Sequence, residues 1–501
     1  MRNSRWTLRS AVVTAVGLAA ATALPAGLAS AQVSTARPAT AAVRPMVKLI
    51  LAQKTINVPR FGKRAFIDTG AYVIAVGNPL RFNVRRASYA KPITNTQIIS
   101  LASGGTTRRP LPIRTVKNWD GLHRFVRITV RNSSGKIVAA HVGPFCPNDF
   151  GQPSGPNAPR RSPFPQECAS DPFQLANAWG IQRGWGVDAG FISAKVPLGK
   201  YKVTINITRL WQRILHLTPS ASTKTVTVKV VKPSQCGGFI CSRRAAKHHQ
   251  ARGGTLPVLP SNVPTLANPP ASSMPDLSPL PSWGIQIIHF GGAHSSDQLS
   301  FGATVWSGGK SRLDVEGFRK HGEPVMRAYQ YFWKNGRIIG RARAGTMGFD
   351  DKPGHTHWHF EQFAQYRLLA KNKTTIVKSR KVGFCIAPTD PVNLLLRNAQ
   401  WQPSFIGFGA CGSQTALSVQ EMMPIGWGDT YQQFLPGQAF NITHLRNGTY
   451  YIEIIANPNK VLHETNYHNN VSLRKVILGG TPGHRTVKVP AIHGIDPEHM
   501  G

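Results

Sequence analysis

The apolar segments of this chain are short, and their spacing limits the fold more than any other feature. Segments such as "AYVIAVG", "FVRITV" and "KYKVTINITRLW" before residue 233, and "WGIQIIHF", "LSFGATVW" and "TYYIEIIA" after residue 274, are rich in β-branched and aromatic residues in near-alternation. Glycine, proline and asparagine separate them, which is typical of strands joined by turns. No long segment has the helical period. The sequence therefore predicts an all-β protein of the sandwich type.

Two parts of the chain resemble each other. "LHRFVRITVRNSSGKIVAAHVGPFC" runs parallel to "HWHFEQFAQYRLLAKNKTTIVKSRKVGFC", and "GWGVDAG" matches "GWGDTYQ". Between them, residues 233–274 are dense in proline, glycine and serine, which indicates a linker. We therefore expect two tandem β-sandwich-like domains related by duplication, over residues 45–232 and 275–480, followed by a C-terminal tail at 481–501.

The N-terminus has the features of an export signal. Arg2, Arg5 and Arg9 precede an apolar stretch, and the small residues Ala29 and Ala31 follow it. This pattern predicts a signal peptide over residues 1–31, followed by a flexible leader at 32–44. No later segment has the apolar length that a transmembrane helix needs. The expected location is extracellular.

The cysteines agree with export. An even number in an exported chain favours disulfides over free thiols. No two cysteines have the Cys-x-x-Cys spacing of a zinc knuckle or a thioredoxin-like motif. Proximity favours three pairs, although the sequence alone leaves the pairing open: Cys146 with Cys168, Cys236 with Cys241, and Cys385 with Cys411.

The charge is strongly basic, with 60 Lys and Arg against 21 Asp and Glu and a net charge of +39. For an exported protein this favours an anionic cell-wall or matrix polymer as a partner, and solubility alone is an equally weighted explanation. No basic tract carries interleaved aromatic residues, so we expect no specific nucleic-acid partner.

One motif carries a candidate metal site. In "GHTHWHFEQF", His355, His357 and His359 stand at alternate positions. In a strand such residues point to one face, and a bend at Gly354 would let three imidazoles meet on one ion. Imidazole suits copper, zinc, iron and nickel, and three ligands with an open position is a pattern of catalytic metals. The alternative is three polar histidines on a solvated strand face.

The histidine row belongs to an ordered set of motifs. "GHTHWHFEQFAQYRLL" is followed by "KVGFC", a second cysteine, "GWGDTY" and "NPNKVLHETNYHNN", with "MPDL" and "AYQYF" as weaker matches before it. Over about residues 275–480 this set resembles the catalytic domain of lysyl oxidases, and their exported bacterial members in particular. The resemblance implies copper binding by His355, His357 and His359.

The resemblance also implies an organic cofactor, lysine tyrosylquinone, made from two side chains of the chain itself. The matching lysine is Lys381, four residues before Cys385, and the matching tyrosine is Tyr431, at the end of Asp-Thr-Tyr. Animal members differ at three matched positions. They carry a cysteine pair around the tyrosine, where this chain has Trp427 and Gly437, and a histidine in place of Gln365.

The implied activity is that of a secreted copper amine oxidase. A primary amine, free or on a peptidyl lysine, would condense with the quinone and lose a proton from carbon to a general base. Aldehyde, ammonia and hydrogen peroxide would then be released, with molecular oxygen as the oxidant. Asp429 is the candidate base because it lies two residues from Tyr431, and a turn residue after Gly428 is the alternative. Asp350, Asp351 and Glu361 flank the histidines and could orient them or offset positive charge. The alternative function is a non-catalytic metal-binding or wall-associated protein.

The N-terminal copy lacks the residues of this chemistry. At the position of the histidine row it has "NWDGLHRF", with His123 alone. The position of the lysine falls on His141 or Val142, and Ala189 stands where Tyr431 does. We expect this copy either to stabilise its partner or to bind substrate or wall polymer.

Overall fold

The computed structural model describes residues 47–101, 105–159, 161–232, 263–291, 295–318, 323–350, 357–379, 381, 383–402, 411–412 and 414–499. The expected signal peptide and leader, the pair Cys236 and Cys241, and most of the expected linker lie outside these residues. One compact unit spans Arg44–Gly501. Within the described residues, no helix has the length and apolar character that crossing a membrane requires.

The N-terminal half contains three β-sheets. Its strands are β1 Val47–Leu51, β2 Thr55–Phe61, β3 Arg64–Asp68, β4 Ala71–Ala75, β5 Leu80–Arg85, β6 Thr94–Ser100, β7 Thr106–Pro110, β8 Leu122–Arg131, β9 Ile137–Phe145, β10 Gln152–Pro153, β11 Ala176–Ile181, β12 Trp185–Asp188, β13 Phe191–Lys195, β14 Gly199–Ile207 and β15 Thr223–Val231. The sheet orders are β1-β4-β12-β10, β11-β5-β6-β7 and β13-β3-β2-β15-β14-β8-β9. Short helices are η1 Ile113–Thr115, α1 Arg209–Ile214 and α2 Pro219–Ser222.

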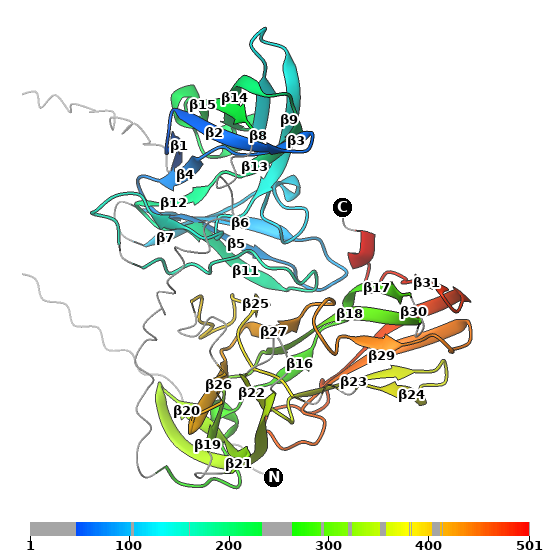
Figure 1. Cartoon of the computed structure of the whole chain (residues 1–501). Coiled ribbons are helices and arrows are strands. Elements are labelled where there is room, and N and C mark those ends of the chain that lie inside the picture. The colour runs from blue at the N-terminus through cyan, green and yellow to red at the C-terminus, as the bar shows by residue number, and fades with distance from the viewer. Residues whose placement is uncertain are drawn as a thin grey trace, which may run out of the picture. The chain divides into compact units, whose positions relative to one another are not determined.

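The C-terminal half also contains three sheets. Its elements are η3 Ala271–Ser273, β16 Leu277–Pro279, β17 Trp283–Phe290, β18 Ser296–Ser307, β19 Leu313–Phe318, β20 Val325–Lys334, β21 Arg337–Asp350, β22 His357–Phe360, β23 Ala364–Leu369, β24 Thr375–Lys378, β25 Asp390–Pro391, β26 Ser418–Met423, β27 Trp427–Tyr431, β28 Ala439–Asn441, β29 Gly448–Ala456, β30 Val471–Thr481, β31 His484–Lys488 and η4 Pro497–His499. The sheet orders are β16-β18-β27-β25 (with β17 and β28 also on β18), β22-β21-β20-β19-β26 and β24-β23-β29-β30-β31 (Figure 1). The all-β prediction is confirmed.

The strand orders of the two halves correspond. The series β15-β14-β8-β9 matches β30-β29-β23-β24, β1-β4-β12-β10 matches β16-β18-β27-β25, and β11-β5-β6-β7 matches β26-β19-β20-β21. The two GWG segments open the matched strands β12 and β27. This agreement is what a duplication requires, and the common origin of the halves stays a prediction.

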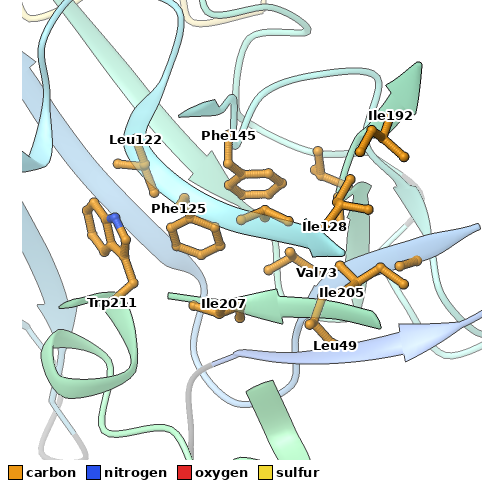
Figure 2. Close-up of a cluster of buried hydrophobic side chains, with 14 of the residues drawn as sticks. Leu49, Val73, Leu122, Phe125, Ile128, Phe145, Ile192, Ile205, Ile207 and Trp211 are labelled. Carbon is orange, nitrogen blue, oxygen red and sulfur yellow. The ribbon is translucent and has the colours of Figure 1, made fainter. Parts of the chain in front are cut away.

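Alternation along the strands builds a core in each half. In β14, Tyr201, Val203 and Ile205 are buried while the residues between them face outward or lie half-buried. Because side chains alternate across a strand, each such strand buries one apolar face, and each buried side chain of this size stabilises the fold by about 1.5–3 kcal/mol. Figure 2 shows the N-terminal cluster, in which Phe125 stacks on Phe145 with ring centroids 4.7 Å apart.

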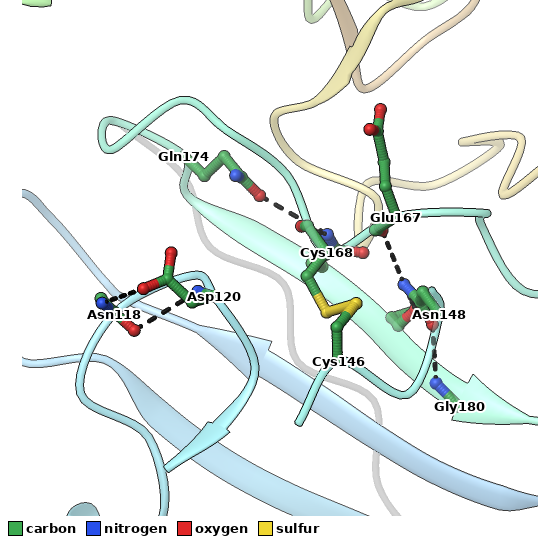
Figure 3. Close-up of a disulfide and its surroundings, with 10 residues drawn as sticks. Asn118, Asp120, Cys146, Asn148, Glu167, Cys168, Gln174 and Gly180 are labelled. Carbon is green, nitrogen blue, oxygen red and sulfur yellow. Dashed lines mark hydrogen bonds between the residues drawn. A yellow bond between two sulfur atoms is a disulfide. The ribbon is translucent and has the colours of Figure 1, made fainter. Parts of the chain in front are cut away.

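Two of the expected disulfides are present. Cys146–Cys168 and Cys385–Cys411 join Cα atoms 5.7 and 5.9 Å apart. Beside the first, the Asn148 amide donates to the Glu167 carbonyl at 3.0 Å and accepts from the Gly180 N–H at 2.9 Å (Figure 3). The disulfide loop is thereby fastened to strand β11.

Two segments that we expected to be peripheral take part in the fold. Near the end of the expected linker, Leu266 donates to the Arg341 carbonyl at 2.8 Å, and Arg341 donates to the Pro264 carbonyl at 2.9 Å. The expected tail includes β31, and the Glu498 carboxylate accepts from the Ile285 N–H at 2.8 Å. Composition marks both segments as irregular, whereas hydrogen bonds to strands β21, β30 and β17 order them.

Candidate active site

Strand β22 carries two of the three histidines. It pairs with β21, with His359 opposite Gly348 and His357 opposite Asp350. Trp358 is fully buried on the other face, as the alternation predicts. The His359 side of the strand is not a solvated face, because His359 is only 5 % exposed.

The two imidazoles converge. Nε2 of His357 and Nε2 of His359 are 2.9 Å apart, and their rings meet edge to face. Nδ1 of His359 lies 4.0 Å from a carboxylate oxygen of Asp350. His355 and Asp351 lie outside the described residues, and among the described residues no group of three His, Cys, Asp or Glu side chains forms a metal cluster. The Glu361 carboxylate accepts from the Thr346 hydroxyl at 2.6 Å and so faces β21.

The segment that carries Lys381 lies beside the histidine strand. Phe360 and Phe384 exchange backbone hydrogen bonds of 2.8 and 3.1 Å. Gly383, the residue before Phe384, packs tightly against the histidine strand, because a Cβ atom added there would lie 2.7 Å from Cβ of His359. Backbone pairing therefore places the segment that carries Lys381 directly beside the strand that carries His357 and His359.

Gly383→Ala should displace His359 and weaken metal binding by about 10- to 100-fold, the range seen when a ligand loses its orientation. Copper titration with metal analysis would measure the change. Gly77→Ala is the matched control, because a Cβ there meets nothing within 4 Å. Unchanged copper affinity in the Gly383 variant would show that this packing does not hold His359 in place.

Lys381 and Tyr431 meet although they are far apart in the sequence. The Nζ atom of Lys381 is 4.2 Å from the centroid of the Tyr431 ring. The Tyr431 hydroxyl accepts a hydrogen bond from the Cys385 N–H at 2.9 Å, and the Phe384 ring stands edge-on to Tyr431 at 5.2 Å. Burial raises the pKa of Tyr431 well above its usual value, and the nearby Asp429 raises it further. The phenol is therefore neutral and lies beneath the amino group of Lys381.

Asp429 lies on the same strand as Tyr431 and is 3 % exposed. Burial raises the pKa of its carboxyl well above the usual value, while Lys381 acts in the opposite direction. Its Oδ2 atom is buried with no hydrogen-bond partner in the described part of the chain. An unpaired buried carboxylate oxygen is costly unless it has a partner or a function, so this atom is a candidate proton acceptor.

Sequence reasoning missed two buried groups at this site. Glu421 on β26 is fully buried, and its carboxylate accepts from the Ile386 N–H at 2.9 Å. Burial raises the pKa of Glu421 well above its usual value, and Asp429 adds to the rise. Tyr366 accepts from the Gln438 amide at 3.3 Å, and burial raises the pKa of Tyr366. A carboxylate at an inward position of the strand "SVQEMM" was the available signal for Glu421.

The positions of the missing animal cysteine pair have other roles here. A Cβ atom at Gly437 would lie 3.2 Å from Cβ of Lys381, so the absence of a side chain lets the lysine stem pack. Trp427 is almost fully buried, and its indole N–H donates to the Gln400 carbonyl at 2.6 Å. In the N-terminal half, the matched Ala189 is buried and offers no reactive group.

The N-terminal half contacts the strand that carries Tyr431. The Thr304 hydroxyl donates to Asp171 at 2.5 Å and shares a 2.8 Å hydrogen bond with the hydroxyl of Thr430, the residue before Tyr431. Asp171 belongs to the N-terminal half and is fully buried. This chain of hydrogen bonds links a buried carboxyl of one half to the candidate active-site strand of the other.

A second set of contacts reaches the other side of Tyr431. The amide of Gln432 donates to the Ser170 hydroxyl at 3.1 Å. The Ser170 N–H and hydroxyl both donate to Asp390 at 2.9 Å. Both chain neighbours of the tyrosine are therefore held, directly or through one residue, by Ser170 and Asp171.

Asp171 should make stability depend on pH. Burial raises its pKa to about 7, so between about pH 4 and 7 the folded state keeps a proton that the unfolded state releases. The free energy of unfolding should therefore fall as pH rises through this window, and level off above it. From pH 5 to 7.5 the contribution of this residue is roughly 2 kcal/mol.

Guanidinium unfolding at the two pH values checks this expectation. The isosteric variant Asp171→Asn should show a smaller fall than the unmodified chain, because it keeps the volume and loses the titration. Buried carboxyls that do not interact with Asp171 contribute equally to both proteins, so the difference reports Asp171 together with its neighbour Asp390. An identical fall in the two would contradict the assignment.

Comparison with known proteins gives the same region a family context. A profile described as lysyl oxidase matches residues 314–486. Lysyl oxidase homolog 2 from Xenopus tropicalis is 26 % identical over 148 residues, which is 29 % of this chain and 18 % of that protein. Human lysyl oxidase homolog 4 is 27 % identical over 149 residues, with the same shares of 29 % and 18 %, and homolog 2B from Danio rerio is 28 % identical over 148 residues, again 29 % and 18 %.

The match thus spans less than a fifth of the length of these curated relatives. The profile match over residues 314–486 includes the histidine strand, the lysine segment and the strand of Tyr431. The named relatives are animal proteins, and a place in an exported bacterial branch stays a prediction.

Proposed function

Since residues 314–486 make this chain a member of the lysyl oxidase family, we propose that it is a secreted, copper- and quinone-dependent amine oxidase. The reaction converts a primary amine, water and molecular oxygen into an aldehyde, ammonia and hydrogen peroxide. Two electrons and two protons leave the C–H and N–H bonds of the amine and reduce oxygen to peroxide, and water then cleaves the C–N bond to release ammonia. The family match covers the candidate site. The amine substrate and the secretion of the chain are proposed in addition.

The observation that carries the proposal is the contact between Lys381 and Tyr431, with Nζ 4.2 Å from the ring centroid. A lysine amino group placed over a buried neutral phenol is the precursor arrangement that lysine tyrosylquinone needs. The hydrogen bond from the Cys385 N–H holds the tyrosine in register with the lysine segment.

The histidines fit a copper ion. Two nitrogen ligands about 2.0 Å from one ion and at a right angle to each other lie about 2.8 Å apart, and the Nε2 atoms of His357 and His359 are 2.9 Å apart. Tetragonal nitrogen sites favour Cu(II). His355, His357 and His359 would hold the metal, which supplies oxidation of the phenol by oxygen.

The protein groups around the tyrosine would bind the amine and move its proton. The chain has only 21 acidic residues, yet Asp429 and Glu421 both act electrostatically on Tyr431. When the Asp429 carboxyl ionises at higher pH, its negative charge would offset the basic surroundings for a cationic amine. The unpaired Oδ2 of Asp429 would take the proton from the carbon next to the nitrogen.

We assign the N-terminal half a non-catalytic role. It has Ala189 at the tyrosine position, Ser170 contacts Gln432, and Asp171 is linked to Thr430 through Thr304. Holding the tyrosine strand in place is the function that these contacts support.

His357→Ala tests the proposal directly. Purified chain grown with copper in air should carry about one copper and release peroxide from simple primary amines, and the variant should lose both. His444→Ala is the control, because His444 is exposed and lies outside the site. Copper binding without amine-dependent peroxide would favour the non-catalytic metal-binding alternative.

A further inference from the structure

The N-terminal half contains a cavity of about 740 Å³ whose wall is strongly basic. Besides small and apolar residues, the wall has His123 and five arginines: Arg114, Arg124, Arg127, Arg209 and Arg213. Of the described residues, none that lines it is acidic. Its volume lies within the range of about 300–1,000 Å³ that is common for small-molecule sites.

The fold builds this wall from separate segments of the chain. Arg114 comes from η1, Arg124 and Arg127 from β8, and Arg209 and Arg213 from α1. Strand β8 departs from regular pairing with β9 between Leu122 and Val126. Such bulges redirect side chains and are frequent beside functional sites.

The bulge is held rigidly. Arg124 has a φ of 49°, in the left-handed region that is unfavourable for a side chain of this kind. The hydroxyl of Thr208 donates to the Arg124 carbonyl at 2.8 Å, and the Trp211 indole N–H donates to the His123 carbonyl at 3.0 Å. Trp211 itself lies in the hydrophobic cluster with Phe125 (Figure 2). These contacts hold the backbone of His123 and Arg124, and the Arg124 side chain is exposed at the cavity.

No counter-ion of these arginines is found in the described part of the chain. Among the residues that the structure describes, no ion pair or side-chain hydrogen bond satisfies any of the five guanidinium groups of this wall. Neighbouring positive charge also acts on His123, whose pKa is lowered by burial and then by Arg124 and Lys117. Five like charges around one hollow repel each other, and a bound anion would relieve that repulsion.

We propose that this arginine cavity binds a ligand with several phosphate groups. Guanidinium groups form paired hydrogen bonds that match phosphate oxygens, and five arginines with no lysine favour that geometry over a diffuse attraction. Among the described residues of the wall there is no Phe, Tyr or Trp, and the nearby Trp211 is fully buried. Bases of a single-stranded nucleic acid would therefore find no stacking platform. The proposal is independent of the amine oxidase function.

Calorimetric titration of the full chain with sodium tripolyphosphate, at near-physiological salt, tests the site. We expect one binding event, weakened about tenfold or more in the triple variant Arg124→Ala, Arg209→Ala, Arg213→Ala. The matched control is Lys63→Ala, Lys195→Ala, Lys229→Ala, which removes the same charge from exposed positions outside the cavity and should bind normally. Citrate, a compact tricarboxylate, should bind about tenfold more weakly than tripolyphosphate.

Replacing the same three arginines with lysine keeps the charge and removes the guanidinium fork. We expect the affinity of this lysine variant for tripolyphosphate to lie between those of the unmodified chain and the alanine variant. If the alanine variant does not fold, the lysine variant is used for the test. A competition experiment, in which poly(glycerol phosphate) displaces bound tripolyphosphate, tests whether the site takes a phosphodiester polymer or only small polyphosphates. Binding of either kind of phosphate supports the site. Three results would overturn the proposal. The first is an equal loss of tripolyphosphate affinity in the arginine and lysine-control variants, and the second is an equal affinity for citrate and tripolyphosphate. The third is a single-stranded oligonucleotide that binds more tightly than both phosphate probes.

Discussion

Tyr431→Phe and Lys381→Arg should each reduce amine-dependent peroxide release by a factor of about 10³ or more, as removal of a covalent catalytic group does. Each variant removes one partner of the cross-link and leaves the histidines in place. Phenylalanine keeps the ring that packs against Phe384 and loses the hydroxyl that accepts from the Cys385 N–H. Copper binding should therefore persist while the quinone does not form.

Peptide mass spectrometry and a quinone stain make the test specific. Copper-loaded chain grown in air should yield a peptide in which Lys381 and Tyr431 are joined, and neither variant should. Tyr329→Phe is a control, because Tyr329 lies on β20 against Arg341 and away from this site. An active chain with both residues unmodified would refute the quinone mechanism, whatever the result for copper.

Asp429→Asn should lower kcat by about 10²- to 10⁴-fold, the usual contribution of a positioned general base. The variant keeps the volume of the side chain and removes its ability to take a proton. Cross-linking of Lys381 to Tyr431 should still be detectable by mass spectrometry, which separates a defect in turnover from a defect in cofactor formation.

The pH dependence gives a second measurement of the same residue. Burial raises the pKa of Asp429, so activity should rise with pH as the carboxyl ionises, and Asp429→Asn should lose this rising limb. Glu421 is coupled to Asp429, so the limb reports the pair rather than one residue. Asp314→Asn is the matched control: Asp314 is also fully buried, but its oxygens accept from Trp333 and Gln420. Equal losses in the two variants would indicate that buried charge in general, and not the base, is responsible.

The sequence by itself determined the all-β class, because alternation of apolar residues reports directly which face of a strand is buried. The same periodicity placed Trp358 in the core behind the histidines and put Asp429 and Tyr431 on one side of β27. Proximity along the chain was enough to pair Cys146 with Cys168 and Cys385 with Cys411. The family motifs supplied the candidate roles of Lys381 and the histidines, which periodicity alone does not assign.

Only the tertiary structure decided which distant residues meet. The approach of Lys381 to Tyr431 depends on the pairing of Phe360 with Phe384 and on the missing side chain at Gly437. Local pattern does not encode such register, because pairing between distant strands is set by the whole core. For the same reason the sequence did not reveal the arginine cavity: its charges lie in three short segments that look like ordinary surface, and the bulge in β8 and the packing of Trp211 bring them to one hollow.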